Sequence, residues 1–320
     1  MSKQRKIAKQ LGPEQFGIMS FVISFVSMFI ILTDFGLTTL MVREVSRDQG
    51  RLSEYFINGT FLKIILGIIT FGIVRGISQF IGKPDFYITL ILIYCGYSII
   101  NNIGEFIRAF FRPSEHMQYE ALLKIINGIV IIIVIGGSLR IGYGLEGIFY
   151  AYLITGMISL FISIGFVLGK KAISNIATIK LSILISSIKS GFYLGLGNFF
   201  VSIYISIDQI ILGYHGTNYD LGLYAFAYKI TMIYAIVSSV VFSILLPKTA
   251  KDNYIKDIKK NYKRGLKKIA IYNTLIVIGI EIIIFLIYYF NIINFGAYRQ
   301  SLVILMLLLI YCRKQLLFFL

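Results

Sequence analysis

Charged side chains that fall inside long apolar runs are the residues of this sequence best suited to chemistry. Asp34 and Lys63 occupy two successive runs at a similar distance from the loop between them. Asp208 and Lys229 stand in a comparable relation in two later runs. A charge inside a membrane costs about 2.5–3.5 kcal/mol on insertion scales, so each one needs a partner or a function. We therefore expect an ion pair at each place, which either joins neighbouring helices or tunes a cation that binds a ligand.

Two further charges lie in apolar runs without an obvious partner in the sequence. Glu281 is near the middle of its run, where a carboxyl group either binds a proton or cation or finds a polar partner elsewhere in the bundle. Arg75 is near the end of its run, where a long side chain either reaches the membrane interface or binds substrate. Both alternatives stay open for each residue.

The sequence gives little support to an enzyme. Nucleophilic catalysis places Ser, Cys or a carboxylate beside a base such as histidine. His116 and His215 fall in connecting segments on opposite sides of the expected membrane topology, and neither lies in such an arrangement. Cys95 and Cys312 lie in separate apolar runs and are too few for a metal site. We expect no catalytic residue, no metal and no cofactor.

The amino-acid composition is that of a membrane protein. Hydrophobic residues make up 57% of the chain and charged residues 14%, against roughly a quarter charged in soluble domains. Lipid can solvate so much apolar surface if the backbone is hydrogen-bonded within helices or a closed barrel, and long runs without alternation favour helices. The net charge of +16 is explained by basic loops that face anionic lipid, so nucleic acid is not expected as a partner.

The length of the apolar runs predicts an all-α, polytopic transmembrane bundle. A helix needs about 20 mostly apolar residues to cross a bilayer. About nine segments meet this requirement, and they cover residues 16–42, 55–77, 86–110, 120–139, 145–168, 190–213, 221–246, 268–290 and 300–320. The connections are short except for 169–189 and 247–267, which leaves no room for a separate soluble domain.

Basic residues indicate the orientation of these helices. They gather in alternate connections, near residues 43–51, 108–124, 170–189 and 248–268, and these connections are expected in the cytoplasm. The basic N-terminal tail (MSKQRKIAKQ) does not resemble a signal peptide. The alternation would place this tail outside, where cations are disfavoured, and one additional helix before residue 12 would remove the conflict.

The sequence also contains a weak internal repeat. Residues 16–21 (FGIMSF) align with 221–226 (LGLYAF) at an offset of 205, and Arg43 then aligns with Lys248. At an offset of 211, Asp85 and the two residues after it align with 296–298 (GAY), at the start of corresponding helices.

Two copies of an even number of helices share one orientation, which gives a pseudo-twofold axis along the membrane normal. We expect two such lobes around a central cleft, with an N-terminal lobe at residues 1–168, a cytoplasmic linker at 169–189 and a C-terminal lobe at 190–320. If each full copy has six helices, this sequence lacks the first helix of one and the last two of the other.

Short motifs spread over residues 11 to about 300 carry a family resemblance. They are residues 11–17 (LGPEQFG), 33–37 (TDFGL) followed by Arg43 and Glu44, 208–213 (DQIILG), 222–229 (GLYAFAYK) and 295–298 (FGAY). In this order and spacing they resemble the polysaccharide flippase family. This is the O-antigen and teichoic-acid transporter type within the multidrug/oligosaccharidyl-lipid/polysaccharide exporter (MOP) superfamily.

The resemblance implies a flippase for cell-surface polysaccharide biosynthesis. Such a protein moves a polyprenyl-pyrophosphate-linked oligosaccharide from the cytoplasmic to the outer leaflet by alternating access of two lobes. The cations assigned to substrate binding in the cleft are Lys63, Lys229 and Arg75. The acids assigned to coupling or ion pairing are Asp34, Asp208 and Glu281.

The same resemblance implies the location and the partners. We expect a multi-pass protein of a bacterial-type plasma (inner) membrane, with lipid-linked oligosaccharide, membrane lipids and glycan polymerase machinery as partners. Two alternatives stay open, namely a drug or cation antiporter of the same superfamily and a truncated relic without transport activity.

Overall fold

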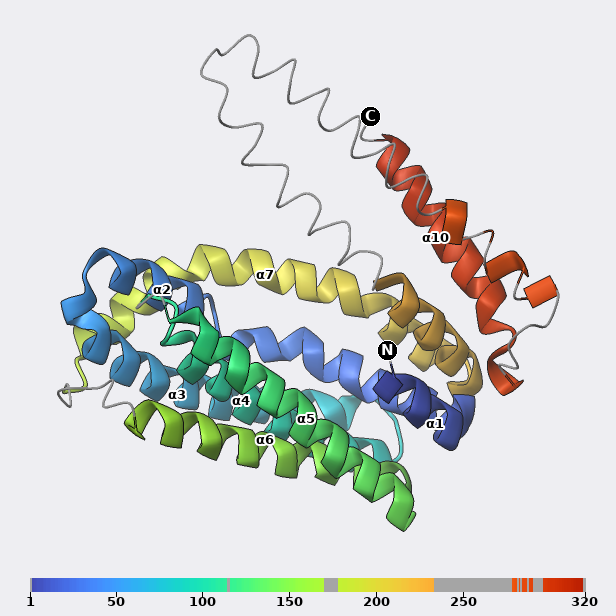
Figure 1. The fold of residues 1–320 in the computed structure, drawn as a ribbon, viewed down its shortest axis with the longest axis horizontal. Helices are drawn as coiled ribbons and strands as arrows, with labels where there is room; N and C mark the ends of the chain where they lie inside the picture. The colour runs from blue at the N-terminus through green and yellow to red at the C-terminus, as the bar shows by residue number, and fades with distance from the viewer. Residues whose placement is uncertain are drawn as a thin grey trace, which may run out of the picture. The chain divides into compact units, whose positions relative to one another are not determined.

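The computed structural model is almost entirely helical (Figure 1). It describes residues 2–113, 116–169, 178–232, 278–280, 282, 284–286, 288–289 and 296–318. Within these residues there are helices, turns and short connections and no β-strand. The all-α fold class predicted from the apolar runs is therefore confirmed.

The helices follow one another with short connections. Their bounds are α1 (Ser2–Ile30), η1 (Ile31–Thr33), α2 (Leu37–Arg47), η2 (Gln49–Arg51), α3 (Leu52–Phe80), α4 (Asp85–Ala109), α5 (Met117–Ile141), α6 (Gly144–Gly169), α7 (Leu181–His215), η3 (Gly296–Tyr298) and α10 (Ser301–Phe318). Residues 218–232 and the described part of 278–289 are helical as well.

Six helical segments in the described part of the chain are long and apolar enough to cross a membrane. They are Leu11–Arg47, Gln49–Phe80, Asp85–Ala109, Met117–Ile141, Gly144–Gly169 and Gly195–His215. The expected spans at 221–246 and 268–290 lie partly outside the described residues, and the expected span at 300–320 coincides with α10. The chain is a multi-pass membrane protein, and the span count is consistent with about nine.

The helix boundaries differ from the expected ones at two places. The basic tail before the first expected span is helical, and α1 is interrupted at Gly12, whose φ of 76° and ψ of 168° are not helical. The following Pro13 starts the next stretch of helix, as proline commonly does. The segment expected as a linker to residue 189 is already helical from Leu181.

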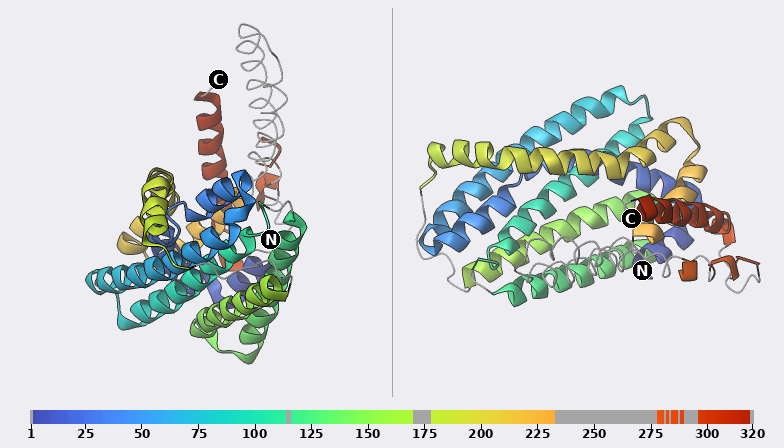
Figure 2. Two further views of the ribbon diagram at one scale, coloured as in Figure 1. Left: turned by 90° about the vertical axis from the view of Figure 1, so that its left-hand side faces the viewer. Right: turned by 90° about the horizontal axis from the view of Figure 1, so that it is seen from above.

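The chain divides into two compact units, one formed by residues 1–11 and 18–215 and the other by residues 12–17 and 216–320. In the first unit, α3, α4, α5 and α6 run side by side, and α7 lies along α2 and α3 (Figures 1 and 2). The most extensive packing joins α4 to α6 and α5 to α6. The lobe boundaries expected at residues 168 and 190 remain a prediction from the sequence.

The second unit has its own apolar core. Ala227, Ile284 and Leu302 belong to one buried cluster with Leu305 and Leu309. Aromatic rings form a second cluster, in which the Phe226 and Tyr298 centroids are 4.8 Å apart and both rings contact Phe16 at 6.4 and 6.2 Å.

Two glycines of the second unit make a reciprocal close contact. A Cβ atom on Gly17 would collide with the backbone oxygen of Asn218, and a Cβ atom on Gly222 would collide with the backbone oxygen of Pro13. The offset of 205 found in the sequence relates Pro13 to Asn218 and Gly17 to Gly222. Each glycine therefore contacts the residue four positions before the other glycine. This is the pattern expected of two equivalent segments that are related by a twofold axis. This contact supports the internal repeat.

The reciprocity predicts equal effects of equivalent substitutions. Gly17→Ala and Gly222→Ala should each lower the stability of the protein by about 1–3 kcal/mol, because a methyl group would force two backbones apart. Thermal unfolding of the purified protein in detergent measures this effect. Gly197→Ala is the matched control, because nothing lies within 4 Å of a Cβ atom at Gly197. A clear effect of only one of the two substitutions would contradict the reciprocal arrangement.

Candidate functional site

The first expected span is broken near one end, and the break carries Asp34. The helix tightens into η1, and Phe35 and Gly36 then adopt positive φ angles of 40° and 76° before α2 begins. Phe35 is the single residue other than glycine with a positive φ in the described part of the chain. Such a conformation in a bulky residue is strained and persists only where its surroundings hold it.

Helix α7 holds the break in place. A Cβ atom on Gly191 would collide with the backbone oxygen of Phe35, and one on Gly195 would lie 2.9 Å from its Cα. These two glycines leave a notch that receives the Phe35 backbone, while the rings of Phe35 and Phe192 stack at 6.0 Å. The backbone conformation at Phe35 thus depends on a helix more than 150 residues further along the chain.

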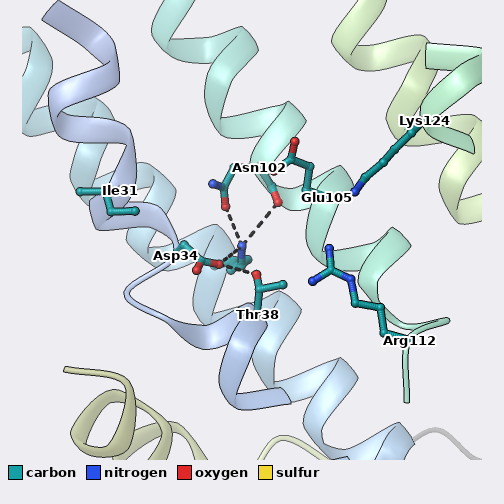
Figure 3. A pocket seen from close by; sticks show the side chains of 8 residues that line it. Ile31, Asp34, Thr38, Asn102, Glu105, Arg112 and Lys124 are labelled. Atoms are coloured by element: carbon teal, nitrogen blue, oxygen red, sulfur yellow. Dashed lines mark hydrogen bonds and ion pairs between the residues drawn. The ribbon is translucent and has the colours of Figure 1, made fainter. Parts of the chain in front are cut away.

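The expected pairing of Asp34 with Lys63 is present in the structure (Figure 3). The Nζ atom of Lys63 lies 2.5 Å from Oδ1 of Asp34, 2.6 Å from Oδ1 of Asn102 and 3.4 Å from the backbone oxygen of Asn102. Thr38 donates a further hydrogen bond to Oδ1 of Asp34, at 2.5 Å. An ammonium group has three N–H donors, so these three acceptors match all of them.

This ion pair lines a charged cavity of about 270 Å³ in the first unit. The lining residues are Ile31, Asp34, Thr38, Lys63, Asn102, Glu105, Arg112 and Lys124 (Figure 3). They come from η1 and the break after it, the start of α2, α3, the end of α4, the turn after α4 and the start of α5. All of these helix ends lie on the side that the basic connections assign to the cytoplasm.

The cations of the cavity differ in accessibility. The Lys63 side chain is 1% exposed, whereas those of Arg112 and Lys124 are 37% and 51% exposed. Both accessible cations bind Glu120: Arg112 donates two hydrogen bonds of 2.7 and 2.8 Å, and Lys124 lies 2.7 Å from Oε1. The two hydrogen bonds to Glu120 raise the pKa of Arg112 above its ordinary value. Arg112 and Lys124 are therefore the charges that an incoming anion can reach.

A buried arginine lies near this cavity. Arg108 is 1% exposed, and its Nη1 atom donates to the hydroxyl oxygens of Ser159 and Ser163 at 3.1 and 3.3 Å, which joins α4 to α6. Its Nε atom has no hydrogen-bond partner in the described part of the chain. Arg108 is one of the basic residues near the cytoplasmic end of the expected span at 86–110, and its two serine partners are not evident from the sequence.

The remaining candidate residues are not part of the cavity. Arg75 is exposed on α3 beyond the apolar middle of the helix. The Oδ1 atom of Asp208 accepts a hydrogen bond of 2.8 Å from the backbone nitrogen of Gln209. Asp208 and Lys229 belong to different units, so their pairing stays a prediction. Glu281 lies outside the described residues.

Lys229 differs from Lys63 in its contacts. Its Nζ atom is buried 4.7 Å from the centroid of the Phe16 ring and has no hydrogen-bond partner among the described residues. A cation over a ring face gains about 2 kcal/mol or more when it is desolvated. This gain offsets only part of the penalty of burying an ammonium group.

Comparison with known proteins gives a family and a fold. The model of the family described as polysaccharide biosynthesis protein matches residues 7–251. A search of curated proteins finds no match.

Among solved structures, an inward-facing multidrug resistance MATE family transporter of the MOP superfamily is 15% identical and has a TM-score of 0.62. The alignment covers 97% of this chain and 76% of that one. A MATE structure in complex with MaD3S is 18% identical, with a TM-score of 0.56 and coverage of 96% and 73%.

A MOP superfamily transporter from Pyrococcus furiosus is 16% identical, with a TM-score of 0.56 and coverage of 96% and 73%. The reverse polarity of its binding pocket suggests a different function for that protein. At these identities the similarity shows a shared fold.

The buried pair predicts strong coupling between Asp34 and Lys63. Asp34→Asn and Lys63→Gln should each destabilise the protein by about 3–5 kcal/mol, because each leaves one buried charge without its partner. The double substitution should destabilise it by clearly less than the sum. Thermal unfolding in detergent measures all three variants, and Arg43→Gln, in an exposed pair with Glu44, is the control. Additive effects would show that the two side chains do not act as a pair.

Proposed function

Because the chain belongs to the polysaccharide biosynthesis protein family, within the MOP superfamily, we propose that it flips a polyprenyl-pyrophosphate-linked oligosaccharide across the membrane. The family and the fold are those of a membrane transporter rather than a catalytic enzyme. The proposed direction is from the cytoplasmic to the outer leaflet of a bacterial-type inner membrane, for the biosynthesis of cell-surface polysaccharide such as O-antigen. The two pseudo-repeated lobes would provide alternating access.

The charged cavity is the observation that carries this proposal. The substrate has a polar, anionic head that cannot cross hydrocarbon unaided and an apolar tail that can stay in lipid. The lining carries three cations and two acids, namely Lys63, Arg112, Lys124, Asp34 and Glu105. A planar guanidinium such as Arg112 binds phosphate oxygens in a two-point contact, and Lys124 adds a point charge beside it.

The individual side chains have different roles in this proposal. The pyrophosphate first replaces the carboxylate of Glu120 on Arg112 and Lys124, because these cations are the accessible ones. Lys63 becomes available only when Asp34 releases it, so Asp34 competes with the substrate for the same ammonium group.

Charges outside the cavity are also proposed to act on the substrate. Lys229 supplies a buried cation that has no hydrogen-bond partner among the described residues. Arg75, which is exposed on α3, is also proposed to meet the substrate. Asp208 and Glu281 are proposed as coupling or ion-pairing acids.

One observation favours a second function, that of a drug or cation antiporter. Asp34 is a partly buried acid whose carboxylate holds Lys63 and Thr38 inside a cavity that also contains Glu105. Protonation of such an acid would release the lysine, which is the kind of event that couples a proton gradient to transport. The two functions differ in their substrate, so a substrate assay separates them.

A flipping assay tests the proposed function. The purified protein is reconstituted in vesicles with a fluorescent, short-chain polyprenyl-pyrophosphate disaccharide, and dithionite reports the fraction in the outer leaflet. The protein should accelerate exchange, and Lys63→Gln and Lys229→Gln should each lower the rate at least tenfold, since a lost contact with a phosphate is worth about 1.5–3 kcal/mol. Arg112→Gln with Lys124→Gln should raise the substrate concentration for half-maximal rate.

The matched control is Arg47→Gln, an exposed cation on α2 outside the cavity. Size-exclusion chromatography shows whether each variant is folded. If the wild-type protein does not flip the lipid, but its vesicles take up ethidium in response to a pH or sodium gradient, the flippase proposal is overturned in favour of the antiporter. Folded protein with neither activity would indicate a truncated relic that does not transport a substrate.

A further inference from the structure

A second cavity opens in the first unit, between the ends of α5 and α6 that meet at the turn around Tyr143. The two helices form a hairpin at the edge of the bundle (Figure 1). Its volume is about 460 Å³, and none of the residues of the charged cavity lines it. The basic connections assign this end of the hairpin to the outer leaflet. The groove is therefore a separate feature with its own surroundings.

The floor of the groove is apolar and partly exposed. Val134 and Ile141 lie on one face of α5, and Ala151 and Ile154 lie on the facing side of α6. Ile141 and Ile154 are exposed. Helix α5 buries a smaller share of its apolar stretch than any other candidate span among the described residues, so it lies at the periphery of the unit. An exposed apolar groove at the periphery of a membrane protein has the shape and the surface to take the acyl chain of a lipid.

The interfacial end of the groove is polar. Glu146, in the first turn of α6, lines it together with the exposed rings of Tyr143 and Tyr150. Glu146 makes no ion pair among the described residues, and neither does Arg140, which is exposed in the last turn of α5. The hydroxyl oxygen of Ser138 is buried in the lining and has no hydrogen-bond partner in the described part of the chain.

We propose that this groove binds a glycerophospholipid whose headgroup carries an ammonium group, such as phosphatidylethanolamine. One acyl chain lies over Val134, Ile141 and Ile154. The ammonium group meets the carboxylate of Glu146 and the faces of the two tyrosine rings, which attract cations. The phosphate lies toward Arg140, and an ester carbonyl accepts the unused hydrogen bond of Ser138.

The charge of Glu146 decides between this occupant and the others present in such a membrane. Phosphatidylglycerol has no cationic group, and its phosphate would gain nothing from a carboxylate. A polyprenyl pyrophosphate would bring several negative charges to the same carboxylate. The groove therefore selects against the proposed transport substrate, so the inference is independent of the flippase function.

Native mass spectrometry tests the inference. Delipidated wild-type protein is titrated with dioleoyl-phosphatidylethanolamine, dioleoyl-phosphatidylglycerol or undecaprenyl phosphate. The ethanolamine lipid should bind about fivefold more tightly than the glycerol lipid, as one partly exposed ion pair provides about 1 kcal/mol. Glu146→Gln should remove this preference.

Asp85→Asn is the matched control, because Asp85 lies in the first turn of α4, as Glu146 does in α6, but outside the groove. It should leave the preference unchanged. Equal binding of the two phospholipids to the wild type would overturn the inference, as would a preference that survives in Glu146→Gln. Displacement of the ethanolamine lipid by equimolar undecaprenyl phosphate would instead make the groove a site for the substrate tail.

Discussion

The ion pair between Lys63 and Asp34 is the interaction on which the helix ends around the charged cavity depend. A lysine in the fourth turn of α3 can be buried there only because a carboxylate reaches it from the break in the first span and Asn102 reaches it from α4. The pair thus joins three helices at one point. The break is equally necessary, since a continuous helix at residues 31–36 would leave Asp34 without this position.

Besides this ion pair, the structure depends on places where segments approach one another closely at glycine residues. Lipid supplies no hydrophobic driving force between helices, so association depends on packing and hydrogen bonds. Gly191 and Gly195 let α7 approach the strained Phe35, and Gly17 and Gly222 make the reciprocal contact in the second unit. At Gly17, Gly191 and Gly222 the nearest contact partner is a backbone oxygen, and at Gly195 it is the ring and backbone of Phe35. The repeat seen in the sequence therefore has a physical basis, because both copies need a residue without a side chain at the same point.

The sequence predicts the fold class, the multi-pass topology and the Asp34–Lys63 contact, since these depend on apolar length and on depth along a helix. It does not predict Asn102 as a partner of Lys63, because an amide on a third helix is brought close only by the angle at which the helices cross. It does not predict the burial of Arg108 or its hydrogen bonds to Ser159 and Ser163 either, because these depend on how α6 packs against α4. The positive φ of Phe35 is also invisible in the sequence, since distant glycines hold it.

Lys63 is buried among its hydrogen-bond acceptors, whereas Arg112 and Lys124 are accessible. In the proposed transport, this difference links substrate binding to a change of structure. An anion that takes Arg112 and Lys124 leaves Glu120 without its two partners, although Glu120 is itself buried. That carboxylate must then move to water or to another cation, and Arg108 is a nearby buried cation with a free Nε donor among the described residues. Moving deeper, the anion reaches Lys63 only by displacing Asp34, which sits on the break that α7 holds. Occupation of the cavity thus acts on the same contacts that hold the break after α1 against α3, α4 and α7, and a substrate without negative charge would leave them unchanged.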